Sequence, residues 1–282
     1  MKPVISCSRR TDIPAFFLDW LLEGLNNGEL NVQHPITKQW RIVPLDPKEI
    51  HTLVLWSKDF HKVLQRWGDL ASLLTDKSGN IRLFFQFTIN SFLPLLEPGL
   101  TKSLDIRLTQ VEEISELTSP RHINWRFDPI VFWREDTEQK DNLRDFNFLV
   151  ESLAAIGIKR CYFSFATWYG KCKQRARKRG FQYIEPSIKE KIAITNQLIK
   201  KTDTYNISLS NCCNPEVNQI PGIQQAGCID GALLSRLMGE RASHARDFGQ
   251  RENCQCTRSI DIGNYTQLCD HSCVYCYANP RI

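Results

Sequence analysis

Val4-Ile5-Ser6-Cys7-Ser8-Arg9-Arg10-Thr11-Asp12-Ile13-Pro14 is the stretch that first indicates the fold. Val4–Cys7 is short, apolar and β-branched in part, which predicts a buried strand. Ile13–Leu25 carries apolar residues on one helical face, and Gly28 follows it as a typical helix stop. The stretch therefore predicts a strand, a polar loop and a helix, in that order.

The same alternation continues over residues 1–210. A helix is predicted over Asp141–Ala155, and Ser187 with Glu190 forms a capping box that opens another helix, which continues to about Lys200. Ile229–Met238 is a further helix candidate. The remaining strand candidates are Thr52–Trp56, Ile81–Thr88, Ile123–Phe127, Arg160–Phe165 and Asn206–Ser210.

Alternating strands and helices imply parallel strands joined by right-handed helical crossovers. Repetition of this unit favours an α/β fold with an open or partial (β/α) barrel, of the TIM-like kind. We expect residues 1–210 to form the barrel core. We expect residues 211–282 to form a cysteine-rich segment packed on the same barrel, so that the chain makes one structural domain.

Composition limits the class of protein. The 282 residues are long enough for a large core, and 42% of them are hydrophobic. No apolar run approaches the roughly 20 residues that span a bilayer, and Met1–Ser6 lacks the pattern of a signal peptide. The formal charge of +5 is mild and does not demand a nucleic-acid partner. We therefore expect a cytoplasmic protein without membrane attachment.

Eleven cysteines in a reducing compartment indicate metal or redox chemistry rather than disulfides. The densest run is Cys269-Asp270-His271-Ser272-Cys273-Val274-Tyr275-Cys276, with the spacing C-x3-C-x2-C. This spacing lets three thiolates from one loop bind three irons of a [4Fe–4S] cluster. The fourth iron then has no cysteine ligand from the loop and is open to a small molecule.

The run Asp261–Asn279, ending in Cys-Tyr-Ala, resembles the cluster loop of radical S-adenosylmethionine (SAM) enzymes, most of all the branch that contains spore photoproduct lyase. The resemblance implies that Cys269, Cys273 and Cys276 hold the cluster, with Tyr275 beside it and SAM on the fourth iron. It further implies reductive cleavage of SAM to start radical chemistry on a substrate, with electrons supplied by a flavodoxin or a ferredoxin.

The whole chain is similar to the bacterial family called domain of unknown function 1848, whose radical-SAM-like cysteines lie near the C-terminus. The likeness rests on Ser8–Pro14, Trp56-Ser57-Lys58, Arg126-Phe127-Asp128-Pro129 and the cysteine loop. In radical SAM enzymes this loop usually follows the first barrel strand. The resemblance therefore implies a circular permutation, in which Ser259–Gly263 is the usual first strand and lies beside Val4–Cys7.

Two further readings of the cysteines remain open. Cys254 and Cys256, with Cys228 and either Cys212 or Cys213, have the composition of a second [4Fe–4S] site. Alternatively, Cys254 and Cys256 join a loop cysteine, or His271, around structural zinc, which would make the protein a non-catalytic zinc or iron–sulfur module. Cys7, Cys161 and Cys172 are expected to be inert.

Polar residues that follow the predicted strands are candidates for the active site. Arg9, Arg10 and Asp12 have the charges to hold the ends of SAM or an anionic substrate. The alternative is that Asp12 caps the next helix and the two arginines are solvated. Lys58, Arg126 and Asp128 also follow strands, although Arg126 and Asp128 also fit an ordinary structural ion pair.

Lys171–Arg179 is the strongest basic run. It has the charge to contact phosphates, which leaves nucleic-acid repair or modification as a further hypothesis. Such runs are more often solvated loops, and we expect a loop here.

Overall fold

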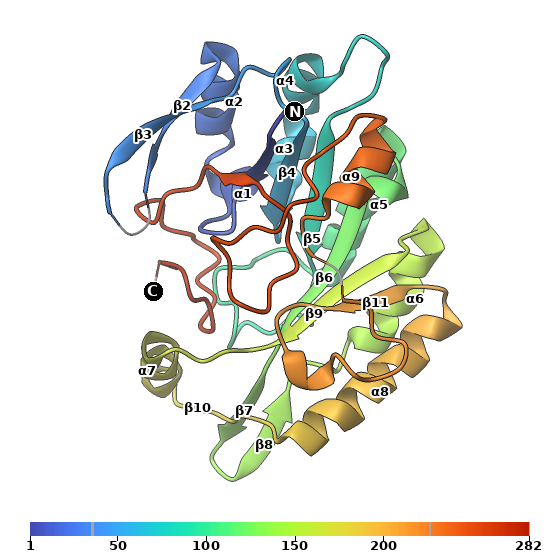
Figure 1. Cartoon of the computed structure of the whole chain (residues 1–282). Helices are drawn as coiled ribbons and strands as arrows, with labels where there is room; N and C mark the ends of the chain where they lie inside the picture. The colour runs from blue at the N-terminus through green and yellow to red at the C-terminus, as the bar shows by residue number, and fades with distance from the viewer. Residues whose placement is uncertain (35–36, 226, 282) are drawn as a thin grey trace.

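The computed structural model describes residues 1–34, 37–225 and 227–281. Its centre is a seven-stranded parallel sheet in the order β11-β9-β6-β5-β4-β1-β12 (Figure 1). The predicted α/β class with parallel strands is confirmed. These strands are β1 (Val4–Cys7), β4 (Thr52–Ser57), β5 (Leu83–Thr88), β6 (Ile123–Ile130), β9 (Arg160–Phe165), β11 (Ser208–Asn211) and β12 (Ile260–Asp261).

Nine α-helices occur among the described residues, and most of them cover the outer face of this sheet. Their apolar stripes pack on alternate residues of the strands, such as Ile5 and Cys7 of β1. The helices are α1 (Ile13–Phe16), α2 (Leu18–Asn27), α3 (His61–Gln65), α4 (Trp67–Leu74), α5 (Leu104–Leu117), α6 (Phe146–Ile156), α7 (Gly170–Lys178), α8 (Ile188–Thr204) and α9 (Gly231–Met238).

The C-terminal segment covers the other face, which we call the inner face. The inward residues Val4, Val54, Phe84 and Tyr162 pack against residues 228–256, including α9. Figure 1 shows this segment, in orange and red, lying across the sheet. Both faces are therefore covered, which explains why most strand residues are buried, including polar ones such as Ser6, Gln86 and Asn124.

Strand β12 lies at one edge of the sheet, parallel to β1. Ile260 pairs with Ile5 and Asp261 pairs with Ser6. The prediction that the segment near Ser259–Gly263 lies beside Val4–Cys7 is confirmed. The spatial order of the sheet is thus the chain order, except that the last strand comes first.

The prediction of one continuous helix over Ile13–Leu25 is wrong, because two helices are present. Phe17 has φ −132° and ψ 29°, which separates α1 from α2. The predicted basic loop at Lys171–Arg179 is also wrong, because most of it is helix α7. Cys172 and Ala176 lie one helical turn apart and are buried on its packed side, a pair that the surrounding charges obscured.

Two small antiparallel sheets escaped the sequence analysis. One joins β2 (Glu29–Gln33) to β3 (Trp40–Pro44). The other has the order β10-β7-β8, with β10 at Gln182–Tyr183, β7 at Phe132–Glu135 and β8 at Glu138–Asp141. Among the described residues, no helix is both long and apolar enough to cross a membrane.

The predicted capping box of α8 is present and yields a stability test. The Ser187 side chain accepts from the Glu190 amide, and the Glu190 carboxylate accepts from the Ser187 amide. Ser187→Ala should lower the free energy of unfolding by about 1 kcal/mol, because a helical N–H loses its acceptor. Urea denaturation measures the change. Lys189→Ala, an exposed position in the same turn, is the control, and an equal effect of both changes would contradict the assignment.

Candidate functional site

The segment after β12 that carries Cys269, Cys273 and Cys276 is called the cysteine loop. It is held against the loop after β5. Val274 donates its amide to the Leu96 carbonyl at 2.9 Å, and Gly99 donates to the His271 carbonyl at 3.0 Å. A Cβ on Gly99 would lie 1.7 Å from the Asp270 oxygen. Glycine is therefore needed at residue 99 for the two backbones to approach.

His271 anchors the middle of the cysteine loop. Its Nε2 lies 2.9 Å from Asp12 Oδ2, and both side chains are buried. Asp12 also accepts from the Ser57 hydroxyl at 2.8 Å and the Lys58 amide at 3.0 Å. The same carboxylate caps α1 through the Ala15 amide. The expected N-cap role of Asp12 is thus present, and the carboxylate also ties the cysteine loop to the ends of β1 and β4.

Tyr275 and Lys58 meet at a buried carboxylate, Glu97. Lys58 Nζ donates to Glu97 Oε1 at 2.8 Å, and the Tyr275 hydroxyl donates to the same oxygen. Asn90 donates to the Tyr275 oxygen at 3.2 Å. Burial by itself raises the pKa of Glu97, but the charges of Lys58 and Arg107 outweigh it, and the net pKa is lowered. Glu97 is therefore an anion in the folded protein at neutral pH.

Helix α7 closes the other side of the cysteine loop. Arg175 Nη1 donates to the Cys276 carbonyl at 2.7 Å, and Lys171 Nζ donates to the Ala278 carbonyl at 3.0 Å. The Cys172 thiol lies against the Tyr275 and Cys276 carbonyls. Part of the basic run therefore contacts the cysteine loop, whereas Arg177 and Arg179 are exposed.

The three loop cysteines form one group of thiols. Burial raises the pKa of Cys269 to about 12 and raises the pKa values of Cys273 and Cys276. Cys273 also feels the charges of Cys269 and Cys276, which raise its pKa further. At neutral pH the thiols are protonated, so a metal must displace these protons in order to bind.

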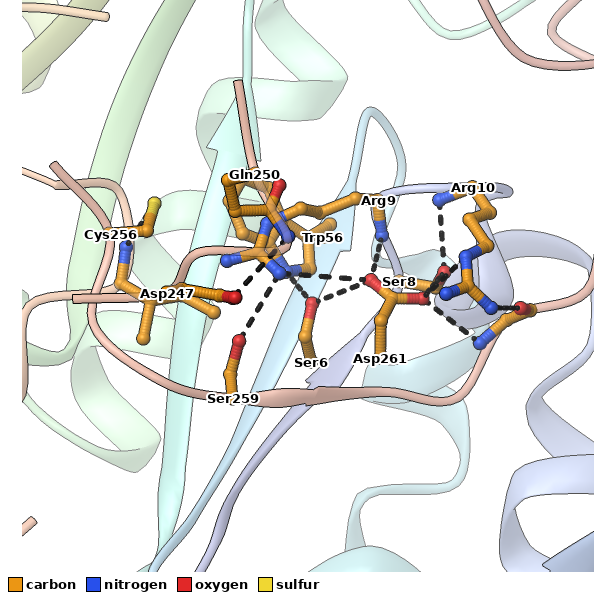
Figure 2. A network of polar contacts seen from close by, with 12 residues as sticks. Ser6, Ser8, Arg9, Arg10, Trp56, Asp247, Gln250, Cys256, Ser259 and Asp261 are labelled. Carbon is orange, nitrogen blue, oxygen red and sulfur yellow. Dashed lines mark hydrogen bonds and ion pairs between the residues drawn. The ribbon is translucent and has the colours of Figure 1, made fainter. Parts of the chain in front are cut away.

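A buried carboxylate, Asp261, joins β12 to the loop after β1 (Figure 2). It accepts from the hydroxyls of Ser6 at 3.0 Å and Ser8 at 2.8 Å, and from the Arg9 amide at 2.9 Å. The guanidiniums of Arg9 and Arg10 lie 4.0 and 3.7 Å from its oxygens. The alternative that these arginines are simply solvated is therefore wrong.

Five further cysteines lie together on the inner face of the sheet, and we call them the thiol ring: Cys212, Cys213, Cys228, Cys254 and Cys256. Cys212 Sγ is 3.6 Å from Cys228 Sγ and 3.8 Å from Cys213 Sγ. Cys254 interacts with Cys213 and Cys256, and Cys256 interacts with Cys228. Each member thus contacts two others, and all the cysteines considered for a second metal site are brought together.

Arginines surround the thiol ring. Arg126 Nη1 lies 2.7 Å from Cys228 Sγ, and Arg126 also pairs with Asp128. The pKa of Cys256 is held well below its usual value, because the Cys228 and Cys254 thiols hydrogen-bond to its sulfur and Arg9 adds positive charge. The expected Arg126–Asp128 pair is present, and its position beside a thiol gives it a further contact.

Neither group of cysteines has its side chains arranged around a position for a single metal ion. Within residues 1–34, 37–225 and 227–281, no three His, Cys, Asp or Glu side chains converge so as to hold a metal ion. The geometry does not support a zinc site that combines Cys254 and Cys256 with a cysteine of the loop. Those two cysteines contact other members of the thiol ring instead.

The predicted polar residues thus lie at three places. Asp12 and Lys58 support the cysteine loop, whereas Arg9, Arg126 and Asp128 border the thiol ring, and Arg10 joins Asp261 to the Gly263 carbonyl at 2.8 Å. The sequence analysis missed Glu97, and it named Ser57 and Arg175 only within longer stretches without their contacts, because the partners of all three are distant in the chain. A polar residue directly after a strand was the one available signal, and Ser57 ends β4.

The fold and site define an α/β protein with a parallel sheet, whose C-terminal segment carries two groups of cysteines. The chain belongs to the family described as domain of unknown function (DUF1848), whose model matches residues 4–278. The family membership expected from the sequence is confirmed, and the match includes the sheet and both cysteine groups. No curated protein matches the chain.

Substitution of Gly99 tests the anchoring of the cysteine loop. Gly99→Ala should displace the loop, because the new methyl group meets the Asp270 backbone. Amide hydrogen exchange over residues 264–281 should become at least about tenfold faster, while exchange in the central strands stays slow. Gly68→Ala is the matched control, since a Cβ there meets nothing within 4 Å. Unchanged exchange in the Gly99 variant would show that the loop does not depend on this contact.

Loss of Lys58 tests the buried ion pair. Lys58→Met leaves the Glu97 carboxylate without its closest cation and should cost about 3 kcal/mol or more in the free energy of unfolding. Adding Glu97→Gln should recover most of that loss, as urea denaturation will show. If the double variant is no more stable than the single one, the pair does not carry this energy.

The same pair predicts how stability depends on pH. A lowered pKa in the folded state means that the contribution of Glu97 is fully present above its unfolded pKa, which is about 4.3. This contribution is lost as the pH falls through the lower folded value. Wild-type stability should therefore fall more steeply below pH 4.3 than that of Glu97→Gln.

Proposed function

We propose that this protein is a radical SAM enzyme built on an open, circularly permuted (β/α) barrel. The observation that carries the proposal is the place of the C-x3-C-x2-C loop, which directly follows a strand paired in parallel with β1. If β12 is taken as the first strand, the sheet runs in consecutive order from β12 to β11. The loop then follows the first strand in space, and it lies at the carboxyl ends of the strands, where barrel enzymes place their active sites.

The donor set of the loop suits a [4Fe–4S] cluster. Cys269, Cys273 and Cys276 would be its ligands, which leaves one iron for the amino and carboxylate groups of SAM. When bound and reduced, the cluster supplies one electron for cleavage of the SAM C5′–S bond, and hydrogen abstraction from a substrate follows. The Ala278 amide lies 3.4 Å from Cys276 Sγ and would stabilise that thiolate.

The residues around the loop would orient it and exclude water. Asp12 holds His271, and Glu97 holds Tyr275, so both intervening segments of the loop are fixed by buried anions. Lys58 lies near Cys273 and lowers the cost of a thiolate there. These side chains are packed against the strand ends, which is the rigid support that a site for radical chemistry requires.

Arg9 and Arg10, which both face Asp261, are proposed to bind the carboxylate of SAM or an anionic substrate. One nitrogen of Arg9, Nη2, is buried without a hydrogen-bond partner. A flavodoxin or a ferredoxin would supply the electron.

The main rival is a non-catalytic iron–sulfur or zinc protein. SAM cleavage separates the two. Protein reconstituted anaerobically with iron and sulfide, then given dithionite and SAM, should release 5′-deoxyadenosine. Cys273→Ala should reduce the yield at least about 100-fold, because the two remaining loop cysteines cannot hold a cluster whose fourth iron is free to bind SAM.

Cys161→Ala is the matched control, since Cys161 is buried in β9 and belongs to neither cysteine group. It should retain wild-type cleavage. Absence of 5′-deoxyadenosine from a wild-type sample that contains the cluster and binds SAM would exclude the radical SAM function.

Nucleic-acid modification is a second hypothesis, which rests on fewer residues. The exposed charges of α7, Arg177 and Arg179, are the groups available to phosphates, because Arg175 is engaged with the cysteine loop. No aromatic residue lies within α7 to stack on bases.

A further inference from the structure

We propose that the thiol ring is a second metal centre, separate from the C-terminal loop, in which thiolates of this ring bind a thiophilic metal. The chemistry shared by an iron–sulfur cluster and by zinc is ligation by four cysteine thiolates. Five cysteines from three separate segments meet there, at residues 212–213, 228 and 254–256. The inference does not depend on radical SAM activity.

Chance packing of apolar cysteines is the first alternative. Cys228, Cys254 and Cys256 are buried, as free cysteines often are. Apolar residues such as Val54 and Phe84 share this cluster, but a charged side chain also enters it. Arg126 is only 6% exposed, and its Nη1 contacts Cys228 Sγ at 2.7 Å, so a buried cation faces this sulfur.

Charge around the ring favours an anionic occupant. Arg9 and Arg126 pair with Asp261 and Asp128, and Arg251 adds a third cation near Cys213, so cations exceed anions among these groups around the ring. Arg9 and Arg126 also lie over the ring of Trp56, at 5.4 and 5.0 Å. Figure 2 shows the Arg9 side chain between Asp261 and the segment of Cys256. Thiolates bound to a metal carry the net negative charge that would balance these guanidiniums.

Backbone groups are also directed at the sulfurs. The Ile229 amide lies 3.5 Å from Cys256 Sγ, and the Cys256 amide lies 3.5 Å from Cys254 Sγ. Such N–H···S contacts stabilise thiolates and set the potential of metal–thiolate centres.

The backbone at the ring is specialised in two places. Cys213 has φ +64°, a left-handed conformation that non-glycine residues rarely adopt and that concentrates at functional sites. Gly227 lies so close to residues 255 and 256 that a Cβ would be 2.4 Å from the Gln255 oxygen. The fold therefore brings the segments of Cys228 and Cys256 together by a contact that only glycine permits.

Sulfurs 3.6 and 3.8 Å apart have about the separation of two thiolates on one tetrahedral zinc, for which Zn–S is about 2.3 Å. The ring, however, holds one cysteine more than a tetrathiolate site needs. Metal loading must therefore remove protons and rearrange the ring. Because Cys212 and Cys213 are adjacent, one of them supplies the fourth ligand beside Cys228, Cys254 and Cys256.

Metal analysis of two variants tests the proposal. In the first, Cys269→Ala, Cys273→Ala and Cys276→Ala remove the loop ligands and leave the ring intact. Prepared anaerobically, this variant should retain either about four irons and four sulfides or about one zinc per chain. Iron with acid-labile sulfide and a visible absorption band identifies a cluster, and zinc without sulfide identifies a single ion. A folded variant with neither would overturn the proposal.

In the second variant, Cys228→Ala and Cys256→Ala remove the ring ligands and leave the loop intact. This protein should lose the metal that the first variant retains, while Cys7→Ala with Cys161→Ala, the control, loses none. If the second variant does not fold, the first decides alone, and its thiols should be protected from a disulfide reagent until the metal is removed. Full reactivity before removal would contradict the inference, and SAM cleavage assayed separately reports on the loop.

Discussion

The carboxylate of Asp261 is the point on which the rest of the site depends. It accepts hydrogen bonds from Ser6, Ser8 and the Arg9 amide, and it faces two guanidiniums. These contacts fix the two-residue strand β12 against β1, a pairing too short to be stable from backbone hydrogen bonds alone. Because the cysteine loop begins eight residues later, its place at the strand ends follows from this one buried anion.

Buried charge organises the molecule at three neighbouring places. Asp12 binds His271, Glu97 binds Lys58 and Tyr275, and Asp261 binds the loop after β1. Each anion joins a strand end to a segment distant in the chain. Pairs of this kind add little net stability compared with apolar packing, but removal of one partner is costly, so they favour one arrangement of the loops over others. The polar residues of this protein are thus concentrated where loops must be held in register.

The two cysteine groups differ in how they are built. The loop cysteines come from one short segment, and their thiols are protonated because burial raises their pKa values. The thiol ring combines three segments on the inner face and is bordered by Arg9 and Arg126. The first group lies within one loop, whereas the second exists only where the C-terminal segment crosses the sheet.

By itself, the sequence determined the parallel α/β class, six strands close to their observed bounds, the capping box of α8 and the spacing of the loop cysteines. These features are local, because a strand, a cap or a C-x3-C-x2-C spacing involves residues a few positions apart. The continuous helix over Ile13–Leu25 and the loop over Lys171–Arg179 were predicted wrongly. Phe17 leaves the helical conformation, and the charges of the basic run obscured the buried pair Cys172 and Ala176. Tertiary structure alone decided that Glu97 meets Tyr275, that Arg175 meets Cys276 and that five cysteines form one ring, because those contacts join residues that approach only when the C-terminal segment folds over the sheet.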